Sequence, residues 1–437
     1  MRNKFWAITA VLIIFISGIL ILQLKTRDVP SPNVLLITVD SLRPDHLGCY
    51  GYPKNISPNI DKLAKEGVIF TQAIAQASWT VPAMVSIATS TYPSTHKVYT
   101  WDTDLAPELL TLARLLKRSG YRSFFCSGHN KTLSAILGAQ GGFEEWTNNE
   151  VPVSAGKVNQ AALKFINHNY KNKFFLWVHY MDTHDHFIGV TENDKLSQPS
   201  FKAADIVKYD AAITQVDEQV GEIIEELKRL NINKNTLIII TADHGEEMCE
   251  HGLCFNHGGF LWDSLIRVPL IFTWDNPSVK DIRSGQVQHI DIAPTVCKIL
   301  KIKPPASFEG QSLLPMFSKG KKTLAAAFSE HQEKQGDIKD GVWIYTKFSV
   351  RFNQRKFVYT AYPNSIEHEF YNLENDPGEL DNLIKHNRLP DAEKEKFDSL
   401  KSKLKIWSQR KKPQINPATK SLDEKTKERL KSLGYLH

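Results

Sequence analysis

Cysteine is scarce in this chain, with five residues among 437, and no pair has the close spacing of a zinc-binding motif. An odd and small set of this kind does not describe a disulfide framework. Cys249 and Cys254 can bridge within one loop, although two unpaired thiols are an equal alternative. The sequence also lacks long internal repeats and any lysine- and arginine-rich stripe with interleaved aromatic residues, and its formal net charge is +6. We therefore expect no nucleic acid among its partners.

Long hydrophobic runs are also rare, and residues 5–24 form the one that is long enough to cross a membrane. Arg2 and Lys4 precede this run, and Lys25 and Arg27 follow it. About 20 apolar residues span the hydrocarbon core of a bilayer. Because no small-x-small cleavage site is evident near the end of the run, we predict an uncleaved signal anchor rather than a removed signal peptide. The flanking charges leave its orientation open. We expect a single-pass protein of the cell membrane, with the large domain on the extracytoplasmic side.

Short apolar runs alternate with helical patterns along most of the chain. Residues 33–39, 174–180 and 236–241 are apolar and rich in β-branched or aromatic residues, which is typical of strands buried on both faces of a parallel sheet. Residues 203–230 repeat apolar side chains at the spacing of a helix that packs on a sheet. These patterns predict an α/β fold with a large, mostly parallel sheet flanked by helices.

The pattern changes beyond Gly310, where residues 343–350 and 356–360 form shorter, half-exposed strand patterns. They predict a small C-terminal α+β subdomain that contains an antiparallel sheet. The end of the chain is rich in lysine and glutamate, as is usual for a solvated helix and tail. The predicted domains are a transmembrane anchor and linker over residues 1–29, a large catalytic domain over 30–310, the small antiparallel-sheet subdomain over 311–390, and a charged helical tail over 391–437.

Three predicted strands end in side chains that bind metals or transfer protons. Asp40 follows the first of these strands, Asp243 and His244 follow another, and His184 follows the third, with His179 nearby. In an open α/β sheet, ligands bind beyond the carboxyl ends of the strands. Carboxylate and imidazole groups gathered there indicate a divalent cation, although an Asp-His-Gly sequence is also an ordinary solvated turn.

Thr80 stands two positions before Pro82, at the start of a predicted helix over residues 82–89. A helix N-terminus offers N–H groups and the positive end of a dipole, which suits a phosphate or sulfate oxyanion. A hydroxyl beside a divalent cation can act as a nucleophile. Taken alone, Thr80 is better explained as the N-cap of that helix, which is the common use of threonine at such a position.

The order of these features resembles the sulfatase family within the alkaline phosphatase superfamily. The resemblance extends from about Pro32 to the C-terminus and rests on a series of ordered matches. They are NVLLITVDSLRPDH (33–46), YGY (50–52), SPNIDKLAKEGVIF (57–70), WTVP (79–82), TADHGE (241–246), IRVPL (266–270), DIAPT (291–295), YNLENDPGE (371–379) and LKSLGY (430–435).

The resemblance implies three metal ligands, which are Asp40, Asp243 and His244. It places Thr80 at the position of the catalytic nucleophile and matches His184 to the histidine that protonates the leaving group. His257 falls where many members of the family place a substrate-binding lysine. One divalent metal ion is implied as the cofactor, with calcium as the first expectation and manganese or zinc as alternatives.

The sequence departs from the family pattern at two places. Activated sulfatases carry a Cys or Ser that is oxidised to formylglycine, whereas this chain carries Thr80, which cannot form that aldehyde. Met84 stands where an arginine supports the formylglycine, and Ser41 stands where a second carboxylate is usual. We therefore expect no formylglycine in this protein.

The expected function is that of a membrane-anchored, metal-dependent hydrolase or transferase that acts on phosphate or sulfate esters through Thr80. Phosphate esters are expected to be preferred, because a phosphothreonine can be resolved by water or by an acceptor hydroxyl. The expected substrates are sulfated or phosphorylated small molecules, glycans or lipid headgroups. The alternatives are an arylsulfatase-like sulfuric ester hydrolase and a degenerate member that binds a glycan without turnover.

Overall fold

The structure is a computed structural model that describes residues 31–184, 203–275, 281–317, 325–335, 343–385, 388–413, 415–419 and 422–432. The chain divides into two compact units, Met1–Pro32 and Asn33–His437, and the second contains every described helix and strand. The predicted anchor over residues 5–24 lies outside the described residues. Within the described ranges, no helix combines the length and the apolar character needed to cross a bilayer.

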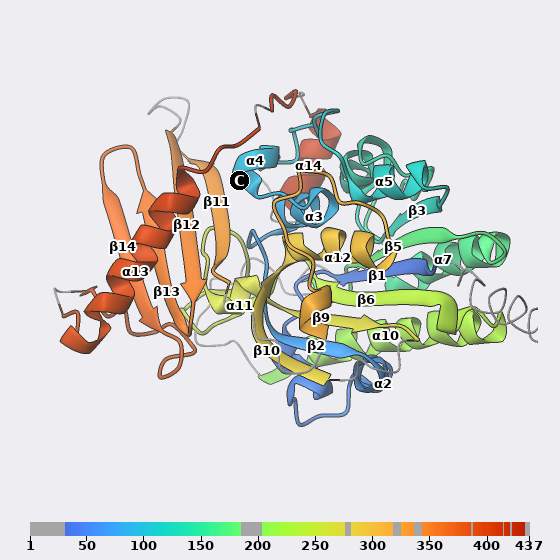
Figure 1. Cartoon of the computed structure of the whole chain (residues 1–437), viewed down its shortest axis with the longest axis horizontal. Helices are drawn as coiled ribbons and strands as arrows, with labels where there is room; N and C mark the ends of the chain where they lie inside the picture. The colour runs from blue at the N-terminus through green and yellow to red at the C-terminus, as the bar shows by residue number, and fades with distance from the viewer. Residues whose placement is uncertain are drawn as a thin grey trace, which may run out of the picture. The chain divides into compact units, whose positions relative to one another are not determined.

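A large mixed sheet of eight strands carries the candidate site residues (Figure 1). Its strand order is β10-β2-β9-β6-β1-β5-β3-β4, and all neighbours are parallel except that β9 is antiparallel to both β2 and β6. The strands are β1 (Asn33–Val39), β2 (Val68–Ile74), β3 (Arg122–Ser127), β4 (Glu145–Trp146), β5 (Phe174–Tyr180), β6 (Thr236–Ala242), β9 (Arg267–Thr273) and β10 (Asp281–Gln288). The predicted mostly parallel sheet is thereby confirmed.

The three central strands are the ones that the sequence identifies most clearly. Every residue of β1, β5 and β6 is buried, because helices cover both faces of the sheet at this point. Val39, the last residue of β1, lies beside Tyr180 of β5 and Ala242 of β6. The three strands therefore end at one level, and the residues that follow them meet at one edge of the sheet.

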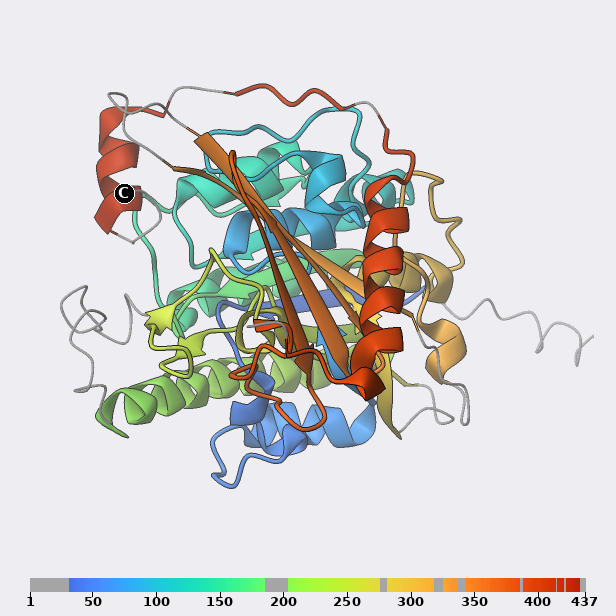
Figure 2. The same cartoon turned by 90° about the vertical axis from the view of Figure 1, so that its left-hand side faces the viewer.

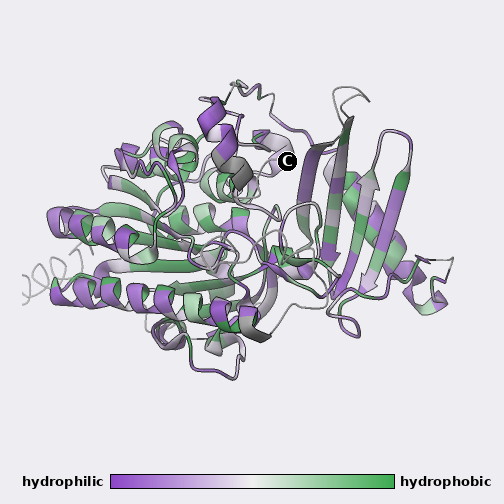
Figure 3. Ribbon diagram, turned by 180° about the vertical axis from the view of Figure 1, so that it is seen from behind, coloured by the Kyte–Doolittle hydropathy of each residue, from purple (hydrophilic) through white to green (hydrophobic). Residues whose placement is uncertain are grey.

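Helices flank the sheet on both sides. α2 (Pro58–Glu66) and α7 (Ala155–Asn169) pack against α10 (Ala203–Arg229) on one face, while α3 (Thr80–Thr89), α5 (Leu112–Arg118) and α12 (Ile292–Ile299) form a group on the other (Figure 1). α10 buries the apolar stripe that its sequence predicts, including Tyr209, Val220 and Leu227. In Figure 3 the strands are mostly green, whereas the helices in front of them alternate between purple and green along their length. This colouring is that of amphipathic helices on an apolar sheet.

The C-terminal part forms a second, antiparallel sheet of four strands. Its order is β11 (Ala327–Gln335), β12 (Trp343–Phe352), β13 (Arg355–Ala361) and β14 (Ile366–Asn372). The long helix α13 (Asp391–Ser408) runs alongside these strands (Figure 2) and packs on β12 and β13. Leu400, Leu404 and Trp407 of α13 share a small apolar core with Val350 and Phe357. The predicted C-terminal antiparallel sheet is confirmed, and α13 completes its core.

Buried ion pairs join the antiparallel sheet to the large sheet. Asp263, at the start of α11 (Asp263–Ile266), lies 3.0 Å from Arg351 Nε and 3.0 Å from Lys356 Nζ. Lys356 Nζ also lies 2.8 Å from Glu379 Oε1. Burial alone would raise the pKa of Asp263, but Arg351 and Lys356 lower it to about 2. Each charge in this group depends on the others, because water does not reach them.

We predict that Asp263→Ala lowers the free energy of unfolding by about 3–5 kcal/mol, since it leaves buried cations with an incomplete set of partners. Urea denaturation followed by tryptophan fluorescence measures the change. Glu225→Ala is the control, because Glu225 pairs with Lys228 on the exposed surface of α10, where an ion pair contributes little to stability. Equal stability of the two variants would show that the buried ion pairs do not hold the sheets together.

Candidate active site

Asp40, His179 and Asp243 form a compact, fully buried group at the ends of β1, β5 and β6. Each offers one ligand atom, and the three atoms lie within 4.8 Å of one another. Asp40 and Asp243 directly follow their strands, whereas His179 is the last but one residue of β5 and lies beside Thr38 of β1. The structure thus brings together the two aspartates that the sequence singles out, and it adds His179, to which the sequence gave no role as a ligand.

His244 lies next to this group. Its Nε2 is 3.5 Å from Asp243 Oδ2 and 3.9 Å from Asp40 Oδ1. Its Nδ1 is 2.8 Å from the carbonyl oxygen of Gly245. Because a carbonyl can only accept, Nδ1 carries the proton of the neutral ring, and Nε2 is left with a lone pair directed toward the carboxylates.

The electrostatics of the group suit a cation. Burial raises the pKa of Asp40, and the charge of Asp243 raises it further; burial also raises the pKa of Asp243 to about 7. Burial lowers the pKa of His244 to about 4 and holds that of His179 well below its usual value. Asp243 Oδ2 and His179 Nε2 have no hydrogen-bond partner among the described residues. Two buried carboxylates, a neutral imidazole and two unpartnered ligand atoms fit a divalent cation.

Ser41 reinforces the carboxylates rather than adding a third one. Its hydroxyl donates to Asp40 Oδ1 over 2.9 Å, and its backbone N–H donates to Asp243 Oδ1 over 3.2 Å. Its φ of 55° turns the chain sharply after β1 and makes both contacts possible. Ser41 therefore supports the aspartates in their ionised forms.

Thr80 is the first residue of α3, and Trp79 occupies the N-cap position. The hydroxyl of Thr80 makes no capping bond; Oγ1 lies 3.4 Å from Asp40 Oδ2 and 3.3 Å from His244 Nε2. The predicted helix thus begins two residues earlier than expected, and the N-cap explanation of Thr80 is wrong. The hydroxyl instead faces the buried group, at the positive end of α3.

A group of histidines borders the hydroxyl and the aspartates. The ring of His257 lies 4.6 Å from that of His244 and 5.1 Å from that of His184. His257 Nδ1 lies 3.2 Å from Glu246 Oε2, so a carboxylate orients this ring. Glu246 is a second residue without a role in the sequence interpretation, and its place within the Asp-His-Gly-Glu run was the available signal. The predicted residues Thr80, His184, His244 and His257 therefore occupy one site.

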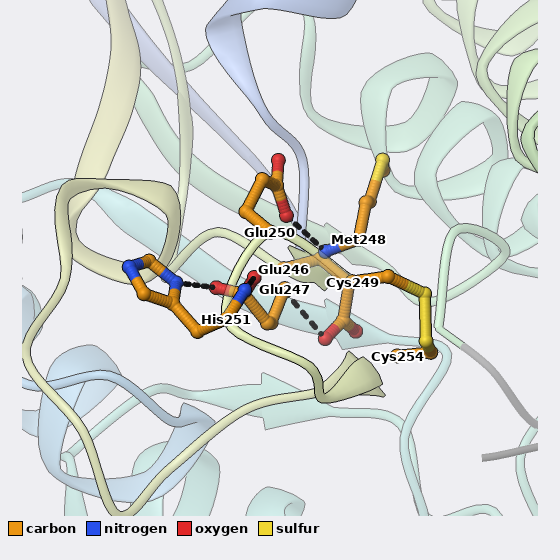
Figure 4. The surroundings of a disulfide bond; sticks show 7 residues. All are labelled: Glu246, Glu247, Met248, Cys249, Glu250, His251 and Cys254. Atoms are coloured by element: carbon orange, nitrogen blue, oxygen red, sulfur yellow. Dashed lines mark hydrogen bonds and ion pairs between the residues drawn. A yellow bond between two sulfur atoms is a disulfide. The ribbon is translucent and has the colours of Figure 1, made fainter. Parts of the chain in front are cut away.

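A disulfide lies within the segment between Glu246 and His257. Cys249 and Cys254 are bonded between the short strands β7 (Glu247–Met248) and β8 (Cys254–Asn256), as Figure 4 shows. Nearby, Glu247 accepts from the backbone N–H of His251 and from the hydroxyl of Ser264. The bridge settles the alternative left open by the sequence, and it restrains the segment between Glu246 and His257.

Comparison with known proteins identifies the family of the chain. The family model Sulfatase matches residues 32–302, and the model N-sulphoglucosamine sulphohydrolase, C-terminal, matches residues 249–409. The chain is 26% identical to an ulvan-active sulfatase of Formosa agariphila over 66% of each protein, and 24% identical to a Delta 4,5-hexuronate-2-O-sulfatase of Bacteroides thetaiotaomicron, covering 81% of this chain and 85% of that one.

Solved structures show the same fold. A 2-O GAG sulfatase superposes with a TM-score of 0.71 at 22% identity, covering 87% of this chain and 93% of that chain. A phosphonate monoester hydrolase of Agrobacterium radiobacter superposes with a TM-score of 0.69 at 20% identity, covering 90% and 100%. Because the sulfatase model alone matches more than half of the sequence, this chain belongs to the sulfatase family of ester hydrolases.

Proposed function

We propose that this protein cleaves or transfers an anionic ester group by attack of the Thr80 hydroxyl, and that it prefers phosphate to sulfate esters. One observation carries the proposal: Thr80 Oγ1 lies between Asp40 and His244, at the N-terminus of α3 and beside the buried group that suits a cation. A nucleophile, a proton acceptor and an oxyanion-binding helix end thus converge on one position.

A divalent cation would be held by Asp40, Asp243 and His179, with His244 as a further ligand or as a proton acceptor. When bound, such an ion stabilises the negative charge on the attacking oxygen and on the ester. Calcium, the first expectation from the family, prefers oxygen ligands, whereas the imidazole in this group favours manganese or zinc. We therefore propose one of these two ions.

The protein groups can move the protons that the reaction requires. His244 Nε2, which lies 3.3 Å from Thr80 Oγ1, is the proposed acceptor of the hydroxyl proton where it does not bind the cation. His184 is fully buried beside His257 and is the proposed donor to the leaving oxygen. His257, oriented by Glu246, is the proposed contact to the non-reacting oxygens of the ester.

The preference for phosphate follows from how the intermediate must break down. A formylglycine hydrate releases sulfate by returning to the aldehyde, so water does not need to attack sulfur. Thr80 has no such route, and Met84 is buried in α3 where an arginine would support the aldehyde. A phosphothreonine can be resolved by water or by an acceptor hydroxyl. The fold is compatible with this chemistry, since one structural neighbour is named a phosphonate monoester hydrolase.

We propose an anionic glycan or lipid headgroup as the substrate, outside the cytoplasm and next to the membrane. The names of several relatives refer to ulvan, glycosaminoglycans or hexuronates, which supports a glycan. The Cys249–Cys254 disulfide supports an extracytoplasmic location, because disulfides persist in oxidising compartments. The hydrophobic run over residues 5–24 supports an anchor.

Two other functions remain as alternatives. Many relatives are named as sulfatases, which favours a sulfuric ester hydrolase. Met84 stands where activated sulfatases carry an arginine, and the absence of that arginine favours a glycan-binding protein without turnover.

The first prediction concerns the cation. The purified full-length protein should contain about one equivalent of manganese or zinc by elemental analysis, and chelation should abolish its activity. Asp40→Asn, Asp243→Asn and His179→Gln should each lower the bound metal at least about tenfold. Asp217→Asn is the control, since this buried aspartate binds the N-terminus of α2 instead. Metal content that is unchanged in His179→Gln but lost in His244→Gln would show that His244 is the third ligand.

The second prediction concerns the nucleophile and the ester. Turnover of 4-nitrophenyl phosphate or bis(4-nitrophenyl) phosphate should exceed that of 4-nitrophenyl sulfate. Thr80→Ala should lower it by about three orders of magnitude or more, because the attacking oxygen is removed. Thr80→Ser keeps a hydroxyl at the same position and should retain most of the activity.

A different outcome would identify one of the alternatives. Repeated sulfate release that disappears in Thr80→Ala would favour the sulfuric ester hydrolase. Tight binding of a sulfated glycan by the metal-loaded protein, without turnover of any of the three esters, would favour the binding protein.

A third prediction concerns the anchor. Detergent, but not a high-salt wash, should release the full-length protein from membranes, because a buried apolar helix is insensitive to salt. Deletion of residues 1–28 should give protein that remains in the supernatant without detergent. Release of the intact chain by salt, with residues 1–24 present in its mass spectrum, would contradict an anchor.

A further inference from the structure

The inner face of the antiparallel sheet meets the loop that carries His257. Side chains alternate along a strand, so Tyr345, Lys347, Ser349 and Arg351 of β12 lie on one face. Arg351 pairs with Asp263 of the large sheet's α11, which turns this face toward the active-site part of the chain. In Figure 1, β11 and β12 are the strands of the antiparallel sheet that lie nearest to that part.

A short loop connects this face with the catalytic centre. The N–H of Gly258 donates to the carbonyl of Ser78 over 2.9 Å, two residues before Thr80. Gly258 and Gly259 have φ values of 81° and 67°, and a Cβ on Gly259 would lie 3.6 Å from the Tyr345 hydroxyl. Phe260 follows and lies against Lys347. The loop therefore has the catalytic residues on one side and β12 on the other.

Lys347 is a buried cation without an anionic partner in contact. The residue is 6% exposed, and its Nζ lies 4.1 Å from the ring centroid of Phe260 and 5.8 Å from that of Tyr345. Among the described residues, no side chain or carbonyl forms a hydrogen bond or an ion pair with this ammonium group. Such an arrangement is costly, because an ammonium group has three donors and a ring face satisfies them poorly.

The carboxylates around Lys347 are engaged elsewhere. Glu333 accepts from the Tyr345 hydroxyl over 2.6 Å, and Glu369 accepts from the Tyr371 hydroxyl over 2.6 Å. Together with Glu367 they act on the ammonium only at longer range. Burial lowers the pKa of Lys347, and these three charges oppose that effect.

Two neighbouring polar atoms are also unsatisfied. His331 lies directly opposite Lys347 in the β11–β12 ladder, and Ser349 is two residues further along β12. His331 Nδ1 and Ser349 Oγ are buried and have no hydrogen-bond partner in the described part of the chain. Most buried polar atoms are paired, so these two unpaired atoms beside Lys347 on one face of the sheet need an explanation.

We propose that Lys347, together with Ser349, binds a second anionic group of the substrate. This group is a phosphate, sulfate or carboxylate on the same molecule whose ester is cleaved at Thr80. The statement that both groups belong to one substrate rests on the proposed function. An ammonium and a hydroxyl supply donors that such a group accepts, whereas His331 Nε2 lies 3.3 Å from Glu333 Oε2, so Nε2 carries the proton of the neutral ring and Nδ1 keeps a lone pair. The preferred substrate is therefore a glycan unit or headgroup with at least two anionic groups.

Calorimetric titration of the full-length, metal-loaded Thr80→Ala protein tests the proposal without turnover. One arm compares glucose 1,6-bisphosphate with glucose 6-phosphate, and a second compares glucosamine 2-N,6-O-disulfate with glucosamine 6-O-sulfate. In at least one arm the doubly charged probe should bind about tenfold more tightly, the factor expected for one charge-assisted contact. The arm with the larger ratio identifies the anion as phosphate or sulfate.

In the same background, Lys347→Met should reduce the affinity ratio of the doubly to the singly charged probe to about one and leave the affinity for the singly charged probe unchanged. Lys347→Arg should retain part of the preference for the doubly charged probe. Lys403→Met is the matched control, because Lys403 lies 4.4 Å over the ring of Phe352 in the antiparallel sheet, in the same kind of contact. It should change neither affinity.

Thermal unfolding separates binding from a structural role. Removal of a buried, unpartnered ammonium should leave the melting temperature of Lys347→Met unchanged or higher. A lower melting temperature, together with equal losses of affinity for the singly and the doubly charged probe, would show that Lys347 only packs against Phe260. Equal affinities within each pair, or no binding of any probe, would also overturn the proposal. If only the proposed ester chemistry is wrong, no Thr80-dependent turnover will be seen, but the affinity ratio of the doubly to the singly charged probe will still depend on Lys347.

Discussion

Two carboxylates that cannot both be charged without compensation determine the arrangement of this site. Asp40 and Asp243 follow adjacent parallel strands, both are inaccessible to water, and burial raises the pKa of each. The surrounding groups lower the cost of ionising them: Ser41 donates to both aspartates, and a neutral histidine borders them on either side. A divalent cation held by these residues would complete this compensation, because it would favour the charged form of each carboxylate.

The proposed catalytic groups lie where this requirement can be met. The rigid ends of β1, β5 and β6 hold the acidic centre, while α3 brings a hydroxyl and the positive end of a helix dipole to it. Glu246 and His257 come from a loop that the Cys249–Cys254 bridge restrains. The bridge lies between them in sequence, and their side chains contact each other directly. Each group is thus fixed by a different element, and the site depends on the packing of all of them.

The parts of the fold that follow local patterns could be predicted from the sequence. Apolar runs predicted the central strands. Asp40 and Asp243 were identified because each is the polar residue that directly follows such a run. His179 was missed because it lies inside an apolar strand, where a histidine is usually a packed core residue. The strands β2, β9 and β10 were missed because Gln72 and Gly285 interrupt their patterns, and because an apolar run such as that of β9 does not reveal its direction. The unpartnered state of Lys347 depends on residues distant in sequence, so no local pattern could show it.

The same physical constraint separates an enzyme from a binding protein. A protein that only held an anionic glycan would need donors at its surface, and it would gain nothing from two carboxylates buried where their pKa values rise. Nor would it need the Thr80 hydroxyl 3.3 Å from a histidine whose Nδ1 proton is fixed by a backbone carbonyl. Such an arrangement destabilises the fold unless a cation and a reaction use it. If Thr80 is the nucleophile, as we propose, the ester that it attacks must be one whose intermediate water or an acceptor can release, and a phosphoryl group meets that condition better than a sulfuryl group.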